Sequence, residues 1–168
     1  MKRHCLALSA LCLAACATAP PNAVATSSSA EADIRAQVDR WFELWSPGAR
    51  AYDWEAFRDL YSEDGILVVD DFGDTITIIR SVDDYIATWA PVMAEGFSSW
   101  AFAPDTLAVQ QSGELAVVTF FATANGVQRD GLRVSPRQQG TLVLAYDASE
   151  NQWEITQEQL TTLPDGVR

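Results

Sequence analysis

The chain has 168 residues and a net charge of −12 at pH 7, and 48% of its residues are hydrophobic. Phosphate backbones and anionic headgroups repel so acidic a chain, which excludes nucleic acid as an expected partner. The only lysine and the only histidine, Lys2 and His4, stand at the extreme N-terminus, so a domain formed by the rest lacks the usual bases of hydrolases and ligands of metal sites.

The first 15 residues have the pattern of a signal peptide. A basic start precedes an apolar stretch from Cys5 to Ala15, which is shorter than the roughly 20 residues that a membrane-spanning helix needs. The segment Leu13-Ala14-Ala15-Cys16 then resembles the lipobox of bacterial lipoprotein precursors. This resemblance implies cleavage before Cys16 and acylation of that cysteine, which would anchor the domain in a membrane. An ordinary secretory signal is the alternative.

The residues around the expected cleavage site predict location and domain bounds. Ala17 follows the cysteine, and in Gram-negative lipoproteins this resemblance implies an outer-membrane anchor facing the periplasm. Cleavage removes Lys2 and Arg3 and leaves 9 arginines against 23 acids, a net charge of −14. Residues 16–30 carry no charge and predict a flexible tether with a reach of roughly 20 Å. Residues 31–163 suit one domain, and residues 164–168 form a short tail.

Helical spacing predicts two helices in the first part of the domain. The first helix ends at Pro47-Gly48 and carries an apolar stripe of Ile34, Val38, Trp41, Phe42 and Trp45. Asp53 is the expected N-cap of the second helix. Its apolar face holds Trp54, Phe57, Leu60 and Tyr61.

A short strand at 66–69 follows, then a polar turn at 70–74 and a second strand at 75–79. Ser81 and Asp84 resemble a capping box for a third helix, whose apolar residues include Tyr85 and Trp89. Pro91 lacks the amide that would bond back to Ala87, so this helix should kink or end near Ala90.

After Pro104 the apolar period changes from 3.6 to 2, which predicts strands. The expected strands span 106–110, 115–127, 138–146 and 152–162, and the link at 128–137 is an expected mobile hairpin end. Strands this long imply a sheet that bends strongly or contains β-bulges. The expected fold class is therefore α+β, a cone with N-terminal helices packed in the concave face of a strongly curved, mostly antiparallel sheet.

This order of elements resembles the NTF2-like superfamily, in its SnoaL-like or ketosteroid-isomerase-like branch. The resemblance lies in the opening aromatic helix, the segment from Asp53 to Gly65, the helix with Trp89, and the closing segment from Trp153 to Thr161. It implies a conical pocket, but not one activity, because this scaffold is used by isomerases, dehydratases, hydrolases and proteins without catalysis.

The closing strand departs from that resemblance. Many relatives carry histidines where this chain has Gln157 and Gln159, and a serine where it has Thr161. Strict alternation puts these three residues on the same face as Trp153 and Ile155, which the resemblance implies is the cavity side. Glutamine forms hydrogen bonds but does not transfer protons near neutral pH, so this strand predicts ligand contact or structural hydrogen bonds rather than catalysis.

Two aspartates are the candidate catalytic residues. Asp70 lies near the place where ketosteroid-isomerase-like enzymes have their base, and Asp64 precedes the same strand, while Tyr61 and Tyr85 are candidate hydroxyl donors. The alternative is that Asp70 is a solvated turn residue beside Gly73. The turn lacks the ligand spacing of a calcium loop, so no metal is expected, and no cofactor is expected either.

Six tryptophans predict either an apolar core or an apolar pocket that they line, with Phe97, Trp100 and Phe102 at its lid or rim. The candidate ligand-binding residues are Trp41, Trp45, Tyr61, Tyr85, Trp89, Trp153, Gln157, Gln159 and Thr161. The leading hypothesis is an envelope-anchored protein that binds a small apolar molecule or a protein partner without turnover. A carboxylate-dependent isomerase or hydratase and a homodimer formed through the sheet face are the alternatives.

Overall fold

The computed structural model describes residues 28–48, 50–73 and 75–164, so the expected signal peptide, Cys16 and most of the expected tether lie outside the described residues. The elements are α1 (Ser28–Leu44), α2 (Trp54–Arg58), β1 (Leu67–Asp71), β2 (Ile76–Ile79), α3 (Val82–Gly96), β3 (Phe97–Ser112), β4 (Leu115–Gln128), β5 (Arg133–Val134), β6 (Arg137–Asp147) and β7 (Gln152–Thr162). Helix α1 already begins at Ser28, inside the range expected to form the tether.

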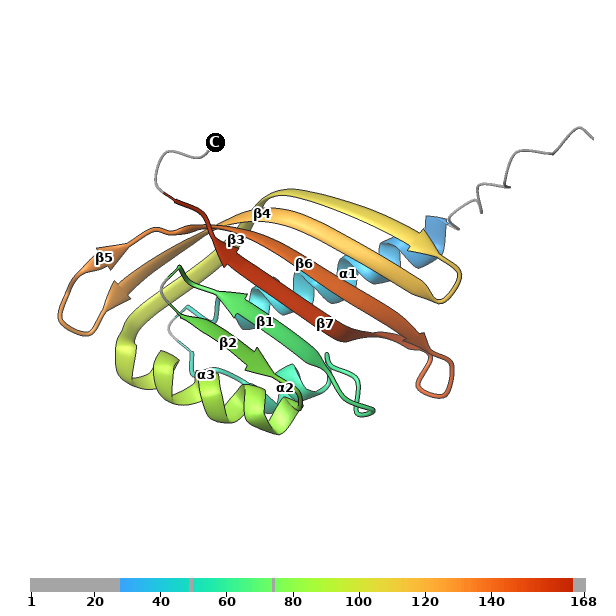
Figure 1. Ribbon diagram of the computed structural model, residues 1–168, viewed down its shortest axis with the longest axis horizontal. Helices are drawn as coiled ribbons and strands as arrows, with labels where there is room; N and C mark the ends of the chain where they lie inside the picture. The colour runs from blue at the N-terminus through green and yellow to red at the C-terminus, as the bar shows by residue number, and fades with distance from the viewer. Residues whose placement is uncertain (1–27, 49, 74, 165–168) are drawn as a thin grey trace, which may run out of the picture.

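The strands form one curved sheet in the order β2-β1-β7-β6-β4-β3, and β5 adds to β4. All the pairs are antiparallel except β1 with β7, which run parallel. Figure 1 shows α1 crossing behind the long strands and α3 running beside β2. The α+β prediction, a strongly curved and mostly antiparallel sheet with N-terminal helices, is confirmed.

The expected caps and apolar stripes are present in the helices. The Asp53 side chain accepts a hydrogen bond from the Ala56 amide at 3.1 Å, and the Ser81 hydroxyl accepts one from the Asp84 amide at 3.1 Å. The α1 stripe is buried, and its members Ile34, Val38 and Trp41 have no exposed surface. Among the described residues, no helix is both long and apolar enough to span a membrane.

Helix α3 does not end near Ala90, because it continues through Pro91 to Gly96. Pro91 lies on the exposed face of the helix, where water can satisfy the carbonyl that loses its partner. Met93, on the opposite face, is buried and holds the last turn against the core. The Arg129 guanidinium also donates to the Ala94 carbonyl at 2.8 Å, which ties the end of α3 to the hairpin that was expected to be mobile.

Two predicted boundaries at the sheet are also wrong. Asp70 and Asp71 belong to β1 and not to a turn, because parallel pairing with Leu160 and Thr161 continues the strand through them. Strand β3 starts at Phe97, directly after α3, well before the expected start at 106. The pairing of β3 with β4 shifts register between Phe97 and Ser99 and again between Pro104 and Thr106. These shifts confirm the expected β-bulges, and they let the long strand bend around the helices.

A third register shift lies in β7 and decides which side chains enter the cone. Leu144 pairs with Ile155 but Val143 pairs with Gln157, so Thr156 is an extra residue in the strand. An extra residue reverses the alternation beyond it. The expectation that Gln157, Gln159 and Thr161 share the concave face with Ile155 is therefore wrong. The residues on that face are instead Glu158, Leu160 and Thr162, and all three line the cavity.

Candidate functional site

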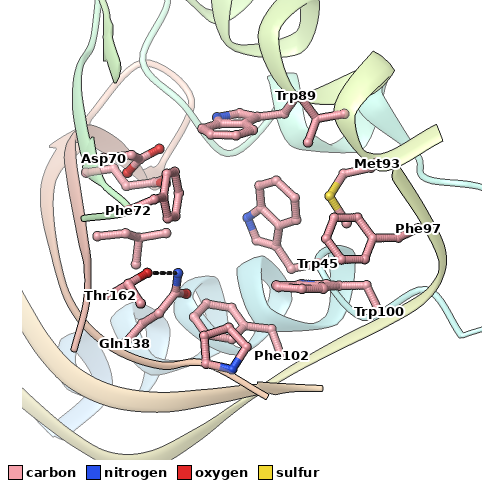
Figure 2. A pocket seen from close by; sticks show the side chains of 14 residues that line it. Trp45, Asp70, Phe72, Trp89, Met93, Phe97, Trp100, Phe102, Gln138 and Thr162 are labelled. Carbon is pink, nitrogen blue, oxygen red and sulfur yellow. Dashed lines mark hydrogen bonds between the residues drawn. The ribbon is translucent and has the colours of Figure 1, made fainter. Parts of the chain in front are cut away.

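A cavity of about 240 Å³ lies between α3, the end of α1 and the concave face of the sheet. Its size suits a small molecule, since a water molecule occupies only about 30 Å³ in the liquid. Figure 2 shows the side chains around it. The wall consists of Trp45, Asp70, Phe72, Trp89, Val92, Met93, Phe97, Trp100, Phe102, Pro136, Gln138, Glu158, Leu160 and Thr162.

Aromatic rings form much of this wall. Phe72 and Trp89 meet edge to face with ring centroids 5.5 Å apart, and Phe97 and Trp100 do the same at 4.8 Å. Phe97, Trp100 and Phe102 were expected at a lid or rim; they lie in the first half of β3 and line the cavity. The wall is therefore almost entirely apolar, and its few polar groups are the ones able to orient a ligand.

Glu158 is the most enclosed of these polar groups, with no exposed surface. The Tyr61 hydroxyl donates to its Oε2, and the Trp41 indole nitrogen donates to the same oxygen at 3.2 Å. The Tyr85 hydroxyl lies 3.3 Å from Oε1 and 3.4 Å from Oε2. Four such contacts stabilise a buried carboxylate, because donors from neutral groups replace the water that it has lost.

Three elements bring these donors to Glu158. Trp41 comes from the last turn of α1 and Tyr85 from the first turn of α3. Tyr61 follows α2 and is held beside β7 by the bond from the Ile155 amide to the Leu60 carbonyl, at 2.8 Å. The Trp41 indole nitrogen also lies 3.0 Å from the Tyr61 hydroxyl, so the donors around Glu158 form a connected network.

Asp70 is the second carboxyl of the wall, and only 1% of its surface is exposed. One carboxyl oxygen receives the Leu160 amide, but Oδ1 has no hydrogen-bond partner. Figure 2 shows the Asp70 carboxyl turned toward the cavity. A buried polar atom without a partner is unusual in a folded protein, and at a cavity wall it indicates a group that meets a ligand.

The two carboxyls affect each other's protonation. Burial, and after it the negative charge of Glu158, raises the pKa of Asp70 to about 9. Burial also raises the pKa of Glu158 to about 7, although the hydrogen bonds from Tyr61, Trp41 and Tyr85 lower it. Near neutral pH the pair therefore retains at least one proton, held mainly on Asp70, and it can both donate and accept a proton.

The structure brings some of the predicted site residues together. Asp70, Trp45 and Trp89 line the cavity, while Trp41, Tyr61 and Tyr85 surround Glu158 just behind the wall. The indole nitrogens of Trp45 and Trp89 are buried without a hydrogen-bond partner, so they too are available donors.

The other predicted residues lie elsewhere. Asp64 is exposed in the turn before β1. Trp153 is buried away from the cavity, with its ring 5.5 Å from that of Tyr146. Because the extra residue Thr156 reverses the alternation in β7, the side chains on the other face of the sheet are those of Gln157, Gln159 and Thr161.

Glu158, Gln138 and Thr162 were missed by the sequence reasoning. Gln138 donates to the Thr162 hydroxyl at 3.4 Å within the wall, as Figure 2 shows. One signal for the bulge was available, because Ile155 and Leu160 are both apolar but have opposite parity along the strand. Both can face the core only if an extra residue lies between them. Within the described ranges, no three His, Cys, Asp or Glu residues are grouped as metal ligands.

Comparisons with known proteins agree with this fold. The family model of the SnoaL-like domain matches residues 34–164. No curated protein matches the chain. Similar solved structures include an NTF2-like protein of unknown function from Pseudomonas putida KT2440, with a TM-score of 0.66 and 21% identity over 83% of this chain and 91% of that one.

Two further structures show the same fold. An NTF2-like superfamily protein from Salmonella enterica serovar Typhimurium LT2 has a TM-score of 0.67 and 18% identity, over 84% of this chain and 96% of that one. A candidate dehydratase of the NTF2-like family from Streptomyces avermitilis has a TM-score of 0.68 and 14% identity, over 82% and 99% of the two chains. With the family model covering almost the whole described domain, the chain belongs to the SnoaL-like domain family and has the NTF2-like fold.

Proposed function

We propose that the domain binds a small, largely apolar molecule in its cavity and transfers a proton to or from it. The observation that supports this most directly is Asp70, a buried carboxyl at an apolar wall with one oxygen that has no partner. Isomerisation and dehydration both need a proton removed at one atom and returned at another. The carboxyl pair can serve both steps, because its protonated member can donate a proton and its ionised member can accept one.

The neighbours of Asp70 give it a role at neutral pH. Since its pKa is raised to about 9, Asp70 holds a proton that it can donate to a ligand oxygen. Glu158 is the charged partner, and the hydroxyls of Tyr61 and Tyr85 hold its charge in place. The indole groups of Trp45 and Trp89 add N–H donors for an oxygen that gains negative charge.

Binding without turnover was the leading hypothesis from the sequence, and it depended on a closing strand with only amides on its inner face. Glu158 removes that reason, because it contributes a titratable group from the closing strand to the cavity wall. Proton transfer is therefore the better-supported function, and binding alone becomes one outcome of the test.

The test is conversion of a β,γ-unsaturated cyclohexenone to its conjugated isomer, followed by ultraviolet absorbance. We expect turnover by the native chain and a loss of about 100-fold in Asp70→Asn, the size expected when a general acid–base group is removed. Asp64→Asn is the matched control, since Asp64 is exposed and should not affect the rate. A native chain that binds the ketone without converting it would reduce the proposal to ligand binding.

We further propose that the mature protein is anchored through an acylated Cys16 at the outer membrane, facing the periplasm. The support is the lipobox-like sequence and the alanine after it, which lie outside the described residues. Palmitate labelling of the native chain that disappears in Cys16→Ser is the expected result. Labelling that continues in the variant would remove the anchor.

A further inference from the structure

The cavity wall combines aromatic rings with negative charge. Six of its 14 residues are aromatic, namely Trp45, Phe72, Trp89, Phe97, Trp100 and Phe102, and two are acids, Asp70 and Glu158. The wall, all of it within the described part of the chain, contains no arginine, lysine or histidine. An anionic ligand would therefore meet repulsion here without any compensating charge.

The two acids lack a positive partner at this site. Glu158 is held only by neutral donors, the hydroxyls of Tyr61 and Tyr85 and the indole of Trp41. Asp70 has the Leu160 amide on one oxygen and nothing on Oδ1, although 99% of its surface is buried. An ionised carboxyl in a buried place is normally paired with a cation, so each acid of this pair, once ionised, leaves a place for a positive charge that the wall does not supply.

Aromatic rings complete such a site. The faces of tryptophan and phenylalanine attract cations, and the attraction is strongest where water is absent. Figure 2 shows Trp89, Phe72, Trp45, Phe97 and Trp100 around the cavity, with Asp70 on the same side as Phe72. The chain's net charge of −12 would also concentrate cations near the domain.

We propose that the ligand of this cavity is a small organic cation, an ammonium group carried on an apolar body. The aromatic rings would surround the methylated or alkylated nitrogen. Glu158 would supply the opposing charge, joined by Asp70 once that carboxyl has lost its proton. This rests on the proposed function in one respect, because it uses the same cavity, and it adds the charge of the ligand. A neutral amphiphile with one oxygen is the competing ligand class.

Two probes of nearly the same shape separate these classes. Phenyltrimethylammonium carries the positive charge, and tert-butylbenzene is its neutral isostere. We expect the purified full chain to bind the cation at least about tenfold more tightly, the size that cation–π contacts in a desolvated site provide. Binding is measured by calorimetry and by the change in tryptophan fluorescence, since Trp45, Trp89 and Trp100 lie in the wall.

Variants assign the preference to the two parts of the site. Above about pH 9, where Asp70 is ionised, Asp70→Asn should remove most of the preference for the cation and leave binding of tert-butylbenzene nearly unchanged. Asp64→Asn, at an exposed position, should leave both affinities unchanged. Trp89→Leu tests the aromatic part, and it serves as the test if Asp70→Asn does not fold. It should weaken binding of the cation severalfold more than binding of the isostere.

The outcomes distinguish this inference from the proposed function. If tert-butylbenzene binds as tightly as the cation or more tightly, the cationic ligand is ruled out while the cavity keeps its binding function. If neither probe binds, the ligand-binding function fails as well. A cation preference that survives unchanged in both Asp70→Asn and Trp89→Leu would place the cation outside this cavity and overturn the inference.

Discussion

Asp70 and Glu158 lie on the same face of two neighbouring parallel strands, because Asp70 pairs with Leu160 while Glu158 pairs with Val68, two residues earlier in β1. This diagonal relationship places two acids at one cavity wall, and it does not require a direct hydrogen bond between them. Both are almost completely buried, so each makes ionisation of the other more costly.

The first prediction concerns stability as a function of pH. Both folded pKa values are raised, to about 9 for Asp70 and about 7 for Glu158, so the folded state binds more protons than the unfolded state. Stability from this pair is fully present below about pH 4 and is lost as pH rises through 7 and 9. We expect the thermal midpoint of the native chain to decrease as the pH is raised from 5 to 9.

Asp70→Asn is the matching variant for this pH effect. Without the Asp70 carboxyl, the fall in thermal midpoint between pH 5 and pH 9 should shrink by several degrees, since each pKa unit is worth about 1.4 kcal/mol. Asp64→Asn should keep the native slope. A variant slope equal to the native one would mean that Asp70 ionises freely in the folded chain.

The second prediction concerns the hydroxyl of Tyr61, which donates to Glu158 in the core. Tyr61→Phe should lower the free energy of unfolding by about 1–3 kcal/mol, because a buried carboxylate loses a donor. Chemical denaturation measures this loss. Tyr146→Phe is the control, since its hydroxyl bonds Asn151 in an exposed hairpin at 2.8 Å and should change stability by less than about 0.5 kcal/mol. Equal effects of the two variants would contradict the importance of the buried network.

The third prediction uses two glycines that face aromatic rings. A Cβ added at Gly140 would lie 2.1 Å from Cζ of Phe120, a buried core ring, so Gly140→Ala should cost about 1–3 kcal/mol. A Cβ at Gly126 would lie 2.6 Å from Cε3 of Trp100, which lines the cavity. Gly126→Ala should therefore weaken ligand binding through displacement of that ring.

Gly96→Ala provides the control for both glycine variants, because no atom lies within 4 Å of the Cβ it would add. It should leave both the unfolding free energy and probe affinity close to native values. Denaturation and calorimetry on the three variants measure the two effects separately. Normal probe binding by a folded Gly126→Ala variant would show that the Trp100 ring is not needed at its present position.

The fourth prediction links ligand charge to pH. Phenyltrimethylammonium has no titratable proton, so any pH dependence of its affinity comes from the protein. Its affinity should rise from pH 6 to pH 9 as Glu158 and then Asp70 lose their protons, while Tyr61 and Tyr85, whose pKa values are raised well above 10, stay neutral. Affinity for tert-butylbenzene should stay flat. A cation affinity that does not change with pH would mean that the acid pair does not face the ligand.

Local signals in the sequence predicted most of the fold. The caps at Asp53 and Ser81 marked the starts of α2 and α3, and β7 was predicted at its full length of 152–162. These features depend on contacts within a few residues. The passage of α3 through Pro91 depends instead on burial of Met93, which only the tertiary structure supplies.

The site was harder to predict, because the face of the sheet on which Glu158 lies depends on Thr156, the unpaired residue of β7. Asp70 was identified, but its place in β1 results from parallel pairing with Leu160, 90 residues later in the chain. Glu158 was missed because alternation counted from Trp153 gives the wrong face after Thr156. Pairing between distant strands has no local sequence pattern, which is why the carboxyl pair became visible only in the folded chain.

The extra residue at Thr156 also bears on how such a site can change in evolution. One further residue inserted between Thr156 and Gln157 would turn the Glu158 carboxylate outward and present the Gln157 amide to the cavity. A single codon gained in this strand would therefore exchange acid–base capacity for neutral hydrogen bonding. Homologues that differ in length here can then differ in chemistry even where the amino acids along the strand are identical.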